Sequence, residues 1–383
     1  MKYLFVFLLL MMGYTGYATD FRIDTGNVDI LKNRALLPAA AKWESFTIRE
    51  NDTLTYTLQL AMDKAGRPLY YSRNIFTPVC YTGECKPVYI NFYWDLLGNY
   101  IRYDLPAAQM LTKLDHREFT WPDYEKLQAI LAKDNSLLAD LQITDLIVPG
   151  TEKLTDSVDA HTGATLKTIQ QEVISGAVYT CYTLWHIVHG PVVAEMQRIT
   201  EGYNSKDLQH RFLLSGSYAY QYWALDKVMD KNGGITPGFE KDLQDVIGGK
   251  NIFISRYILQ KIAPTFFNSQ QRQDWLWDIY ANSVYPFQLD ILRKLKTVKI
   301  RPKLTTRIAG ALADANATQT GLLLSLLQSA SPLPAPAVQQ LGNVLEKAAG
   351  DRAAVIVSLL QQQPGTPQIK TILKDYLPQS NNR

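Results

Sequence analysis

Hydrophobic and polar residues alternate along residues 43–103, whereas they recur at steps of three and four in most of the chain that follows. Strict alternation is typical of half-buried β-strands, and steps of three and four are typical of amphipathic helices. Residues 46–49 and 54–60 alternate clearly and are rich in the β-branched and aromatic side chains that suit strands. The pattern therefore predicts a sheet first and helices afterwards.

Two short turns divide the strand region. In each turn an aspartate is followed three residues later by a glycine, Asp63 by Gly66 and Asp95 by Gly98. Aspartate hydrogen-bonds the backbone of such a turn, and glycine tolerates the positive φ that closes a hairpin. We therefore expect at least two antiparallel hairpins between residues 43 and 103.

The chain changes period after these hairpins. A helix is predicted to begin at Trp121-Pro122, with a second short helical piece extending through Leu141, and Pro149-Gly150 then breaks the chain. Farther on, apolar residues at steps of three and four predict a long amphipathic helix of about six turns that starts just after Thr165. Its apolar stripe consists of Ile169, Val173, Ala177, Cys181, Leu184 and Val188.

Beyond Tyr203 the sequence contains no convincing strand, and short helical segments alternate with clusters of glycine, asparagine, proline and serine. Taken in pairs, the segments repeat with a period in the thirties, which is typical of stacked antiparallel helices of the HEAT type. A compact helical bundle is the competing arrangement. The expected helices cover residues 209–229, 237–246, 252–263, 269–280, 286–295, 304–313, 318–328, 335–349, 352–361 and 367–377.

The first 18 residues are typical of a secretory signal, with Lys2, an apolar run over residues 4–12 and a Gly16-Tyr17-Ala18 cleavage site. The run is too short to span a membrane, and no other stretch is long and apolar enough, so we expect no transmembrane span in the mature chain. The protein is therefore expected to be exported, to the periplasm or outside the cell. The expected organisation is a signal peptide (1–18), an irregular arm (19–42), an α+β domain with an antiparallel sheet and a long helix (43–202), and an all-α repeat domain (203–383).

Charge and cysteine content narrow the function classes. The formal net charge of +3 is close to neutral and gives no argument for nucleic-acid binding. A basic run over residues 293–307 is typical of a solvated helix face and loop; the alternative is docking to an acidic partner or an anionic membrane. In an oxidising compartment Cys80 and Cys85 are expected to form a disulfide, while Cys181 lies on an apolar stripe and is expected to be a buried thiol.

The stretch Asp159-Ala160-His161-Thr162-Gly163-Ala164-Thr165 immediately precedes the expected long helix. A helix N-terminus presents unpartnered N–H groups and a positive dipole end, so it binds phosphate readily. Gly163 and Ala164 leave the backbone accessible, and Thr165 would lie in the first turn with its hydroxyl near that phosphate. The simpler interpretation is a capped helix start.

This heptapeptide resembles the flavin-attachment motif of the FMN-binding domain family, Asp-x-x-Ser/Thr-Gly-Ala-Thr/Ser, and fills each of its fixed positions. Members include subunits of ion-pumping NADH:quinone and Rnf-type electron-transport complexes. The resemblance implies that a flavin transferase links FMN through its phosphate to Thr165, with Asp159, Thr162, Gly163 and Ala164 as recognition elements. It also implies an electron carrier, rather than a stand-alone oxidoreductase, that serves a redox partner outside the cytoplasmic membrane.

Other interpretations remain open. The best-known members of that family are membrane-anchored, which leaves membership of an ion-pumping complex in doubt. The chain can instead be a flavin-free interaction or scaffold protein that uses its helical surface, or a flavin-dependent reductase with its own small substrate. His186 and His189 lie three residues apart and can in principle ligate a metal, but they have no third ligand at a suggestive spacing, so packing is the favoured role.

Overall fold

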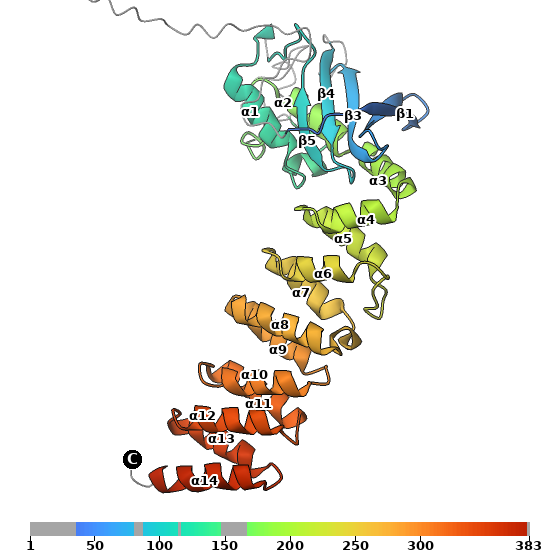
Figure 1. Cartoon of the computed structure of the whole chain (residues 1–383). Coiled ribbons are helices and arrows are strands. Elements are labelled where there is room, and N and C mark those ends of the chain that lie inside the picture. The colour runs from blue at the N-terminus through green and yellow to red at the C-terminus, as the bar shows by residue number, and fades with distance from the viewer. Residues whose placement is uncertain (1–35, 80–86, 114–115, 147–166, 381–383) are drawn as a thin grey trace, which may run out of the picture. The chain divides into compact units, whose positions relative to one another are not determined.

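The computed structural model describes residues 36–79, 87–113, 116–146 and 167–380. The chain divides into two compact units, the first ending at Tyr203 and the second beginning at Asn204 (Figure 1). The first unit combines a sheet with helices, and the described part of the second unit is helical. An α+β N-terminal part and an all-helical C-terminal part are therefore confirmed.

The first unit is built on a five-stranded antiparallel sheet whose spatial order follows the chain order. Each strand pairs with the next through a short connection, which is the simplest topology for alternating sequences separated by turns. The strands are β1 (Lys42–Arg49), β2 (Thr55–Met62), β3 (Pro68–Thr77), β4 (Val88–Trp94) and β5 (Tyr100–Asp104).

The two predicted Asp-x-x-Gly turns are confirmed, between β2 and β3 and between β4 and β5. Gly66 and Gly98 have φ values of 76° and 83°, which lie in the left-handed region that favours glycine. The Asp63 carboxylate accepts hydrogen bonds from two backbone N–H groups of its turn, at 2.8 and 2.9 Å. Asp95 does the same in the second turn, at 2.8 and 2.9 Å.

Helices cover one face of this sheet. Trp94 of β4 is fully buried, and its indole N–H donates to the Val188 carbonyl at 2.9 Å. Tyr71 of β3 is also fully buried, and its hydroxyl donates to the Met196 carbonyl at 3.1 Å. The helical elements of the unit are α1 (Trp121–Leu131), η2 (Leu137–Asp140), η3 (Ile143–Leu146), α2 (Val178–His189) and α3 (Val192–Gly202).

The prediction of a long helix that starts just after Thr165 is wrong for the first half of that helix. The α-helix α2 begins only at Val178, and residues 167–177 form turns and bends. Gly176 has a φ of 76°, a conformation that no residue of a right-handed helix adopts. The apolar stripe nevertheless predicted burial correctly, since Ile169 and Val173 are 1% and 2% exposed. Successive turns can bury residues at steps of three and four without the hydrogen bonds of a helix.

The second unit consists of helices over its described residues, with no strand beyond an isolated bridge between Met229 and Ile235. The helix predicted over residues 209–229 is in fact two helices, because Ser215-Gly216-Ser217 ends the first and Ser217 caps the next. The helices are α4 (Lys206–Leu213), α5 (Tyr218–Val228), α6 (Glu240–Ile247), α7 (Ile252–Lys261), η5 (Pro264–Phe267), α8 (Gln270–Asn282), α9 (Tyr285–Leu295), α10 (Pro302–Ala311), α11 (Ala317–Ser329), α12 (Ala335–Leu345), α13 (Gly350–Gln361) and α14 (Pro367–Ser380).

Buried polar side chains fix the connections within this helical unit. Gln273 of α8 is fully buried and donates to the carbonyls of Phe267 and Lys299, at 3.0 and 2.9 Å. Its side-chain oxygen accepts from the Arg301 N–H at 3.0 Å. One glutamine therefore joins α8 both to the segment before α8, at Phe267, and to the segment between α9 and α10, at Lys299 and Arg301. Figure 1 shows the helices of this unit stacked one after another in chain order.

Candidate functional site

The residues of the predicted flavin site lie outside the described part of the chain. The described chain ends at Leu146 in η3 and resumes at Lys167, so Asp159, Thr162, Gly163, Ala164 and Thr165 all fall between these points. Flavin attachment therefore stays a prediction. The expectation that the motif leads directly into a long helix is no longer tenable, because the residues from Lys167 to Ala177 are not helical.

The cysteines are only partly described. Cys80 and Cys85 lie outside the described residues, so their disulfide stays a prediction. Cys181 of α2 is buried, as its place on the apolar stripe predicted. Its Sγ accepts a hydrogen bond from the Ile174 N–H at 3.3 Å, which ties the turns before α2 to the helix itself.

The chain on both sides of the motif is held close to α2. Before the motif, the Leu141 carbonyl accepts a hydrogen bond from the Tyr182 hydroxyl at 3.0 Å. After the motif, Glu172 forms an ion pair with Lys133 at 2.6 Å. The Lys133 carbonyl in turn accepts from the Trp185 indole N–H at 2.8 Å. Both flanks of the motif-bearing segment are therefore tied, directly or through one residue, to the same helix.

The two histidines of α2 make structural hydrogen bonds. The Nε2 atom of His186 lies 3.0 Å from the Leu138 carbonyl, and that of His189 lies 2.9 Å from the Leu131 carbonyl. Burial lowers the pKa of both imidazoles, which favours neutral rings that donate from Nε2. They join α2 to η2 and α1. Among the described residues no group of three or more histidine, cysteine, aspartate or glutamate side chains is placed to hold a metal ion.

The sheet opens between β2 and β3. These strands pair from Gln59 opposite Ser72 to Met62 opposite Pro68, and no farther. Beyond that point β2 follows β1, and β3 follows β4. We call the gap between residues 55–58 and 73–77 the strand fork. It contains a cavity of about 790 Å³, the fork cavity, whose lining residues come from the end of β1 onward, from β2 and β3, and from α2 and its C-terminal end.

Arg73 of β3 is a buried charged residue that lines the fork cavity. It is 8% exposed, and its guanidinium carbon lies 3.4 Å from the centroid of the Tyr56 ring. Within the described part of the chain its Nε has no hydrogen-bond acceptor, and no carboxylate forms an ion pair with it. Burial lowers the pKa of Arg73, although a guanidinium stays charged at physiological pH.

Another buried arginine of the same sheet has the acidic partner that a buried guanidinium normally has. Arg102 of β5 is 7% exposed and pairs with the equally buried Asp104 at 3.2 Å. Asn91 of β4 donates to the same aspartate at 2.7 Å. Arg73 has no such arrangement among the described residues, since Glu50, which also lines the fork cavity, lies beyond ion-pair distance.

Tyr56 adds a second polar group to the fork cavity. Its hydroxyl is buried and lies beside the Glu50 carboxylate, without a hydrogen bond of standard geometry between them. Burial raises the pKa of Tyr56 to about 12, opposed by the positive charge of Arg73 and reinforced by the negative charge of Glu50. The remaining wall is mixed, with Tyr182, Thr183 and His186 contributed by α2.

Sequence reasoning did not identify Arg73, although a signal for it exists. In β3 the inward positions alternate as Tyr71, Arg73 and Ile75, and all three are buried. An arginine at an inward strand position either has a buried acid or marks a site that receives one. Alternation alone could not distinguish these cases, because the absence of a partner depends on where β2 leaves β3.

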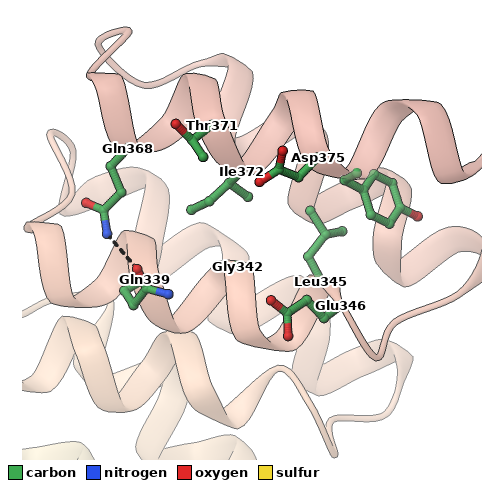
Figure 2. Close-up of a pocket in the computed structure, with 9 residues that line it drawn as sticks. Gln339, Gly342, Leu345, Glu346, Gln368, Thr371, Ile372 and Asp375 are labelled. Carbon is green, nitrogen blue, oxygen red and sulfur yellow. Dashed lines mark hydrogen bonds between the residues drawn. The ribbon is translucent and has the colours of Figure 1, made fainter.

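The second unit contains a groove of about 490 Å³ between α12 and α14. Figure 2 shows Gln368 donating to Gln339 across one end and the carboxylates of Glu346 and Asp375 towards the other. Gln339, Glu346 and Asp375 are exposed, so water can satisfy them. Among its described lining residues none has a buried polar atom without a partner, and the groove by itself does not indicate a ligand.

Three residues of the basic run of the second unit, Arg293, Lys303 and Arg307, form ion pairs with aspartates. Lys303 and Arg307 of α10 pair with Asp274 and Asp278 of α8. Arg293 pairs with Asp290 within α9 at 3.1 Å. These pairs support the interpretation of a structural, solvated face over that of a docking surface for an acidic partner.

Comparisons with known proteins place no constraint on this chain. No protein-family model, no curated protein and no solved structure matches it. Over its described residues, no helix is both long and apolar enough to cross a membrane.

Proposed function

We propose that the first unit carries FMN linked covalently through its phosphate to Thr165 and acts as an electron carrier outside the cytoplasmic membrane. The observation that carries the proposal is the motif Asp159–Thr165, in which every fixed position of the flavin-attachment pattern is filled. Asp159, Thr162, Gly163 and Ala164 are the proposed recognition elements for the flavin transferase. The flavin supplies one- and two-electron chemistry, while the protein supplies position and electrostatics.

Two features of the first unit support this proposal. The motif follows an antiparallel hairpin sheet, as it does in the family that it resembles. Its flanks, at Leu141 and Glu172, are tied to α2 and to Lys133 beside it. These bonds hold the described chain on both sides of the motif close to one helix.

Export and partnership complete the proposal. Residues 1–18 resemble a signal peptide, so a periplasmic or extracellular location is proposed, and electrons would pass to a redox partner protein there. The second unit is proposed to be a HEAT-like array, because its helices follow one another in stacked pairs at intervals of roughly 32 residues. Such arrays commonly supply a binding surface for another protein.

The test uses three matched variants coexpressed with a flavin transferase. Thr165→Ala is expected to lose the covalent adduct, Thr168→Ala to keep it, and Asp159→Ala to lose it through weaker recognition. Thr168 is exposed and lies three residues from Thr165, so it controls for a merely accessible hydroxyl. Peptide fragmentation should place the adduct on Thr165. Labelling of Thr165→Ala at wild-type level would overturn the proposal.

A flavin-free interaction protein is the second candidate, and one observation favours it. Aromatic side chains on α5, α7 and α9 remain exposed, with Tyr218 at 58%, Phe253 at 71% and Tyr285 at 42%. The Tyr222 ring of α5 packs edge-on against the Tyr257 ring of α7, with centroids 5.0 Å apart. Exposed aromatic rows are typical of protein interfaces. Flavin absorbance that survives denaturation and desalting would exclude this candidate as the whole function.

A further inference from the structure

We infer that the fork cavity binds a small aromatic monocarboxylate, whose carboxylate pairs with the guanidinium of Arg73. The inference does not depend on the flavin proposal. It rests on a buried charge, on the shape and chemistry of the cavity around it, and on the one acidic residue in the lining.

The buried charge requires a counter-ion. Arg73 is 8% exposed, its Nε has no hydrogen-bond acceptor among the described residues, and Glu50, whose charge acts on it, lies beyond ion-pair distance. Removing a guanidinium from water without a paired acceptor is unfavourable, which is why buried charges in proteins are normally paired. Arg102 and Asp104 on the same sheet follow that rule. A ligand oxyanion would complete the same arrangement at Arg73.

The orientation of the guanidinium favours an acceptor in its plane. The Tyr56 ring covers one face, at 3.4 Å from the guanidinium carbon, as in a cation–π contact. Stacking leaves the N–H groups, which point outward in the plane, for hydrogen bonding. A carboxylate matches that geometry with two parallel hydrogen bonds.

The cavity has the size and lining of a small-molecule site. Its volume of about 790 Å³ lies within the range of roughly 300–1,000 Å³ found for ligand pockets. The walls include the rings of Tyr182 and His186 from α2, whose centroids lie 4.2 Å apart, and the apolar side chain of Ile75. Aromatic walls around one fixed charge favour a planar, apolar ligand body that carries a single polar head.

Glu50 sets the charge of the ligand. Its carboxylate lines the same cavity and acts on both Arg73 and Tyr56. A second negative charge on the ligand would face this carboxylate, and such like-charge contacts discriminate strongly between ligands. The site therefore favours a carboxylate over a phosphate monoester, which carries close to two charges at neutral pH.

The experiment uses the full chain produced without a flavin transferase, so that its outcome is separate from that of the flavin proposal. Benzoate, phenyl phosphate and uncharged benzamide are titrated by calorimetry. The Nε–H resonance of Arg73 is followed by NMR and assigned by its loss in Arg73→Gln. Benzoate is expected to bind saturably and to shift that resonance. Phenyl phosphate and benzamide are each expected to bind at least tenfold more weakly.

Variants separate recognition from folding. Arg73→Gln should lose benzoate binding, and Arg73→Lys should weaken it at least tenfold because an ammonium cannot form the paired bonds. Arg49→Gln, an exposed arginine that pairs with Asp52, is the control and should bind as the wild type does. Glu50→Gln should bind benzoate more tightly, which tests the site even if Arg73 variants fail to fold.

Four results would overturn the inference. The first is an absence of saturable benzoate binding to the wild-type chain at millimolar concentration. The second is equal binding by wild type and a folded Arg73→Gln variant. The third is weaker benzoate binding by Glu50→Gln. Tighter binding of phenyl phosphate than of benzoate would also overturn it, because the ligand class would then be a phosphate.

Discussion

The hydroxyl of Tyr71 connects the sheet of the first unit to α3, and removing it gives a quantitative test of the packing. Tyr71 is fully buried; its hydroxyl lies 2.9 Å from Thr200 Oγ1 and donates to the Met196 carbonyl at 3.1 Å. Thr200 donates its own proton to the Leu96 carbonyl at 2.5 Å. Thr200 Oγ1 must therefore accept from Tyr71, whose single proton is shared between two acceptors.

This proton arrangement predicts unequal costs for the two obvious substitutions. Tyr71→Phe removes one donor but leaves Thr200 bonded to Leu96, and it should lower the free energy of unfolding by about 1–1.5 kcal/mol. Thr200→Val also removes the hydrogen bond to the buried Leu96 carbonyl, and it should cost about 2–3 kcal/mol. The double variant should cost about 1 kcal/mol less than the sum, because both changes remove the same Tyr71–Thr200 bond.

The assay is native-state hydrogen exchange by mass spectrometry on the full chain, because it reports the opening free energy of the first unit separately from that of the second. Peptides from β3 and α3 should lose protection, while peptides from α8 to α14 should exchange as in the wild type. If Tyr71→Phe leaves the opening free energy unchanged, or if the two substitutions are additive, the assigned network is wrong.

Three further predictions follow from other parts of the chain. Burial raises the pKa of Tyr71 from 10.0 to about 12. The folded state then holds a proton that the unfolded state releases, so Tyr71 contributes a loss of stability of up to about 1.4 kcal/mol per pH unit between pH 10 and 12, and Tyr71→Phe should reduce the slope measured in urea unfolding by that amount. Gln273→Leu removes three hydrogen bonds to backbone groups and should cost about 3 kcal/mol or more in thermal unfolding, whereas the exposed control Gln271→Leu should change stability by less than about 0.5 kcal/mol. Non-reducing peptide mapping should find Cys80 joined to Cys85 and Cys181 outside any disulfide; a disulfide containing Cys181 would contradict both its burial in α2 and the expected pairing.

Local chemistry explains which parts of the fold were predictable from the sequence. The turns at Asp63–Gly66 and Asp95–Gly98 close because each aspartate bonds its own turn and each glycine adopts positive φ. Helix starts in the second unit follow short capping side chains, such as Ser269 before α8. Such signals act over a few residues, so a single sequence contains them in full.

The remaining features depend on contacts between distant residues. Residues 167–177 bury an apolar stripe that is typical of a helix, but they do so in successive turns. Only the positive φ of Gly176 and the packing against α1 and α2 decide between a helix and these turns. The fork cavity exists because β2 and β3 separate after the pair Gln59–Ser72. Neither the length of that pairing nor the absence of an ion pair at Arg73 among the described residues is encoded in local periodicity.

The central claim is tested most directly by the intact mass of the wild-type chain after coexpression with an active flavin transferase, beside a proven substrate of that enzyme. The account predicts that the mature chain, cut after Ala18, gains the mass of one FMN esterified with loss of water, and that the adduct survives denaturation. An unmodified wild-type chain, with the control substrate fully flavinylated in the same cells, would contradict the claim.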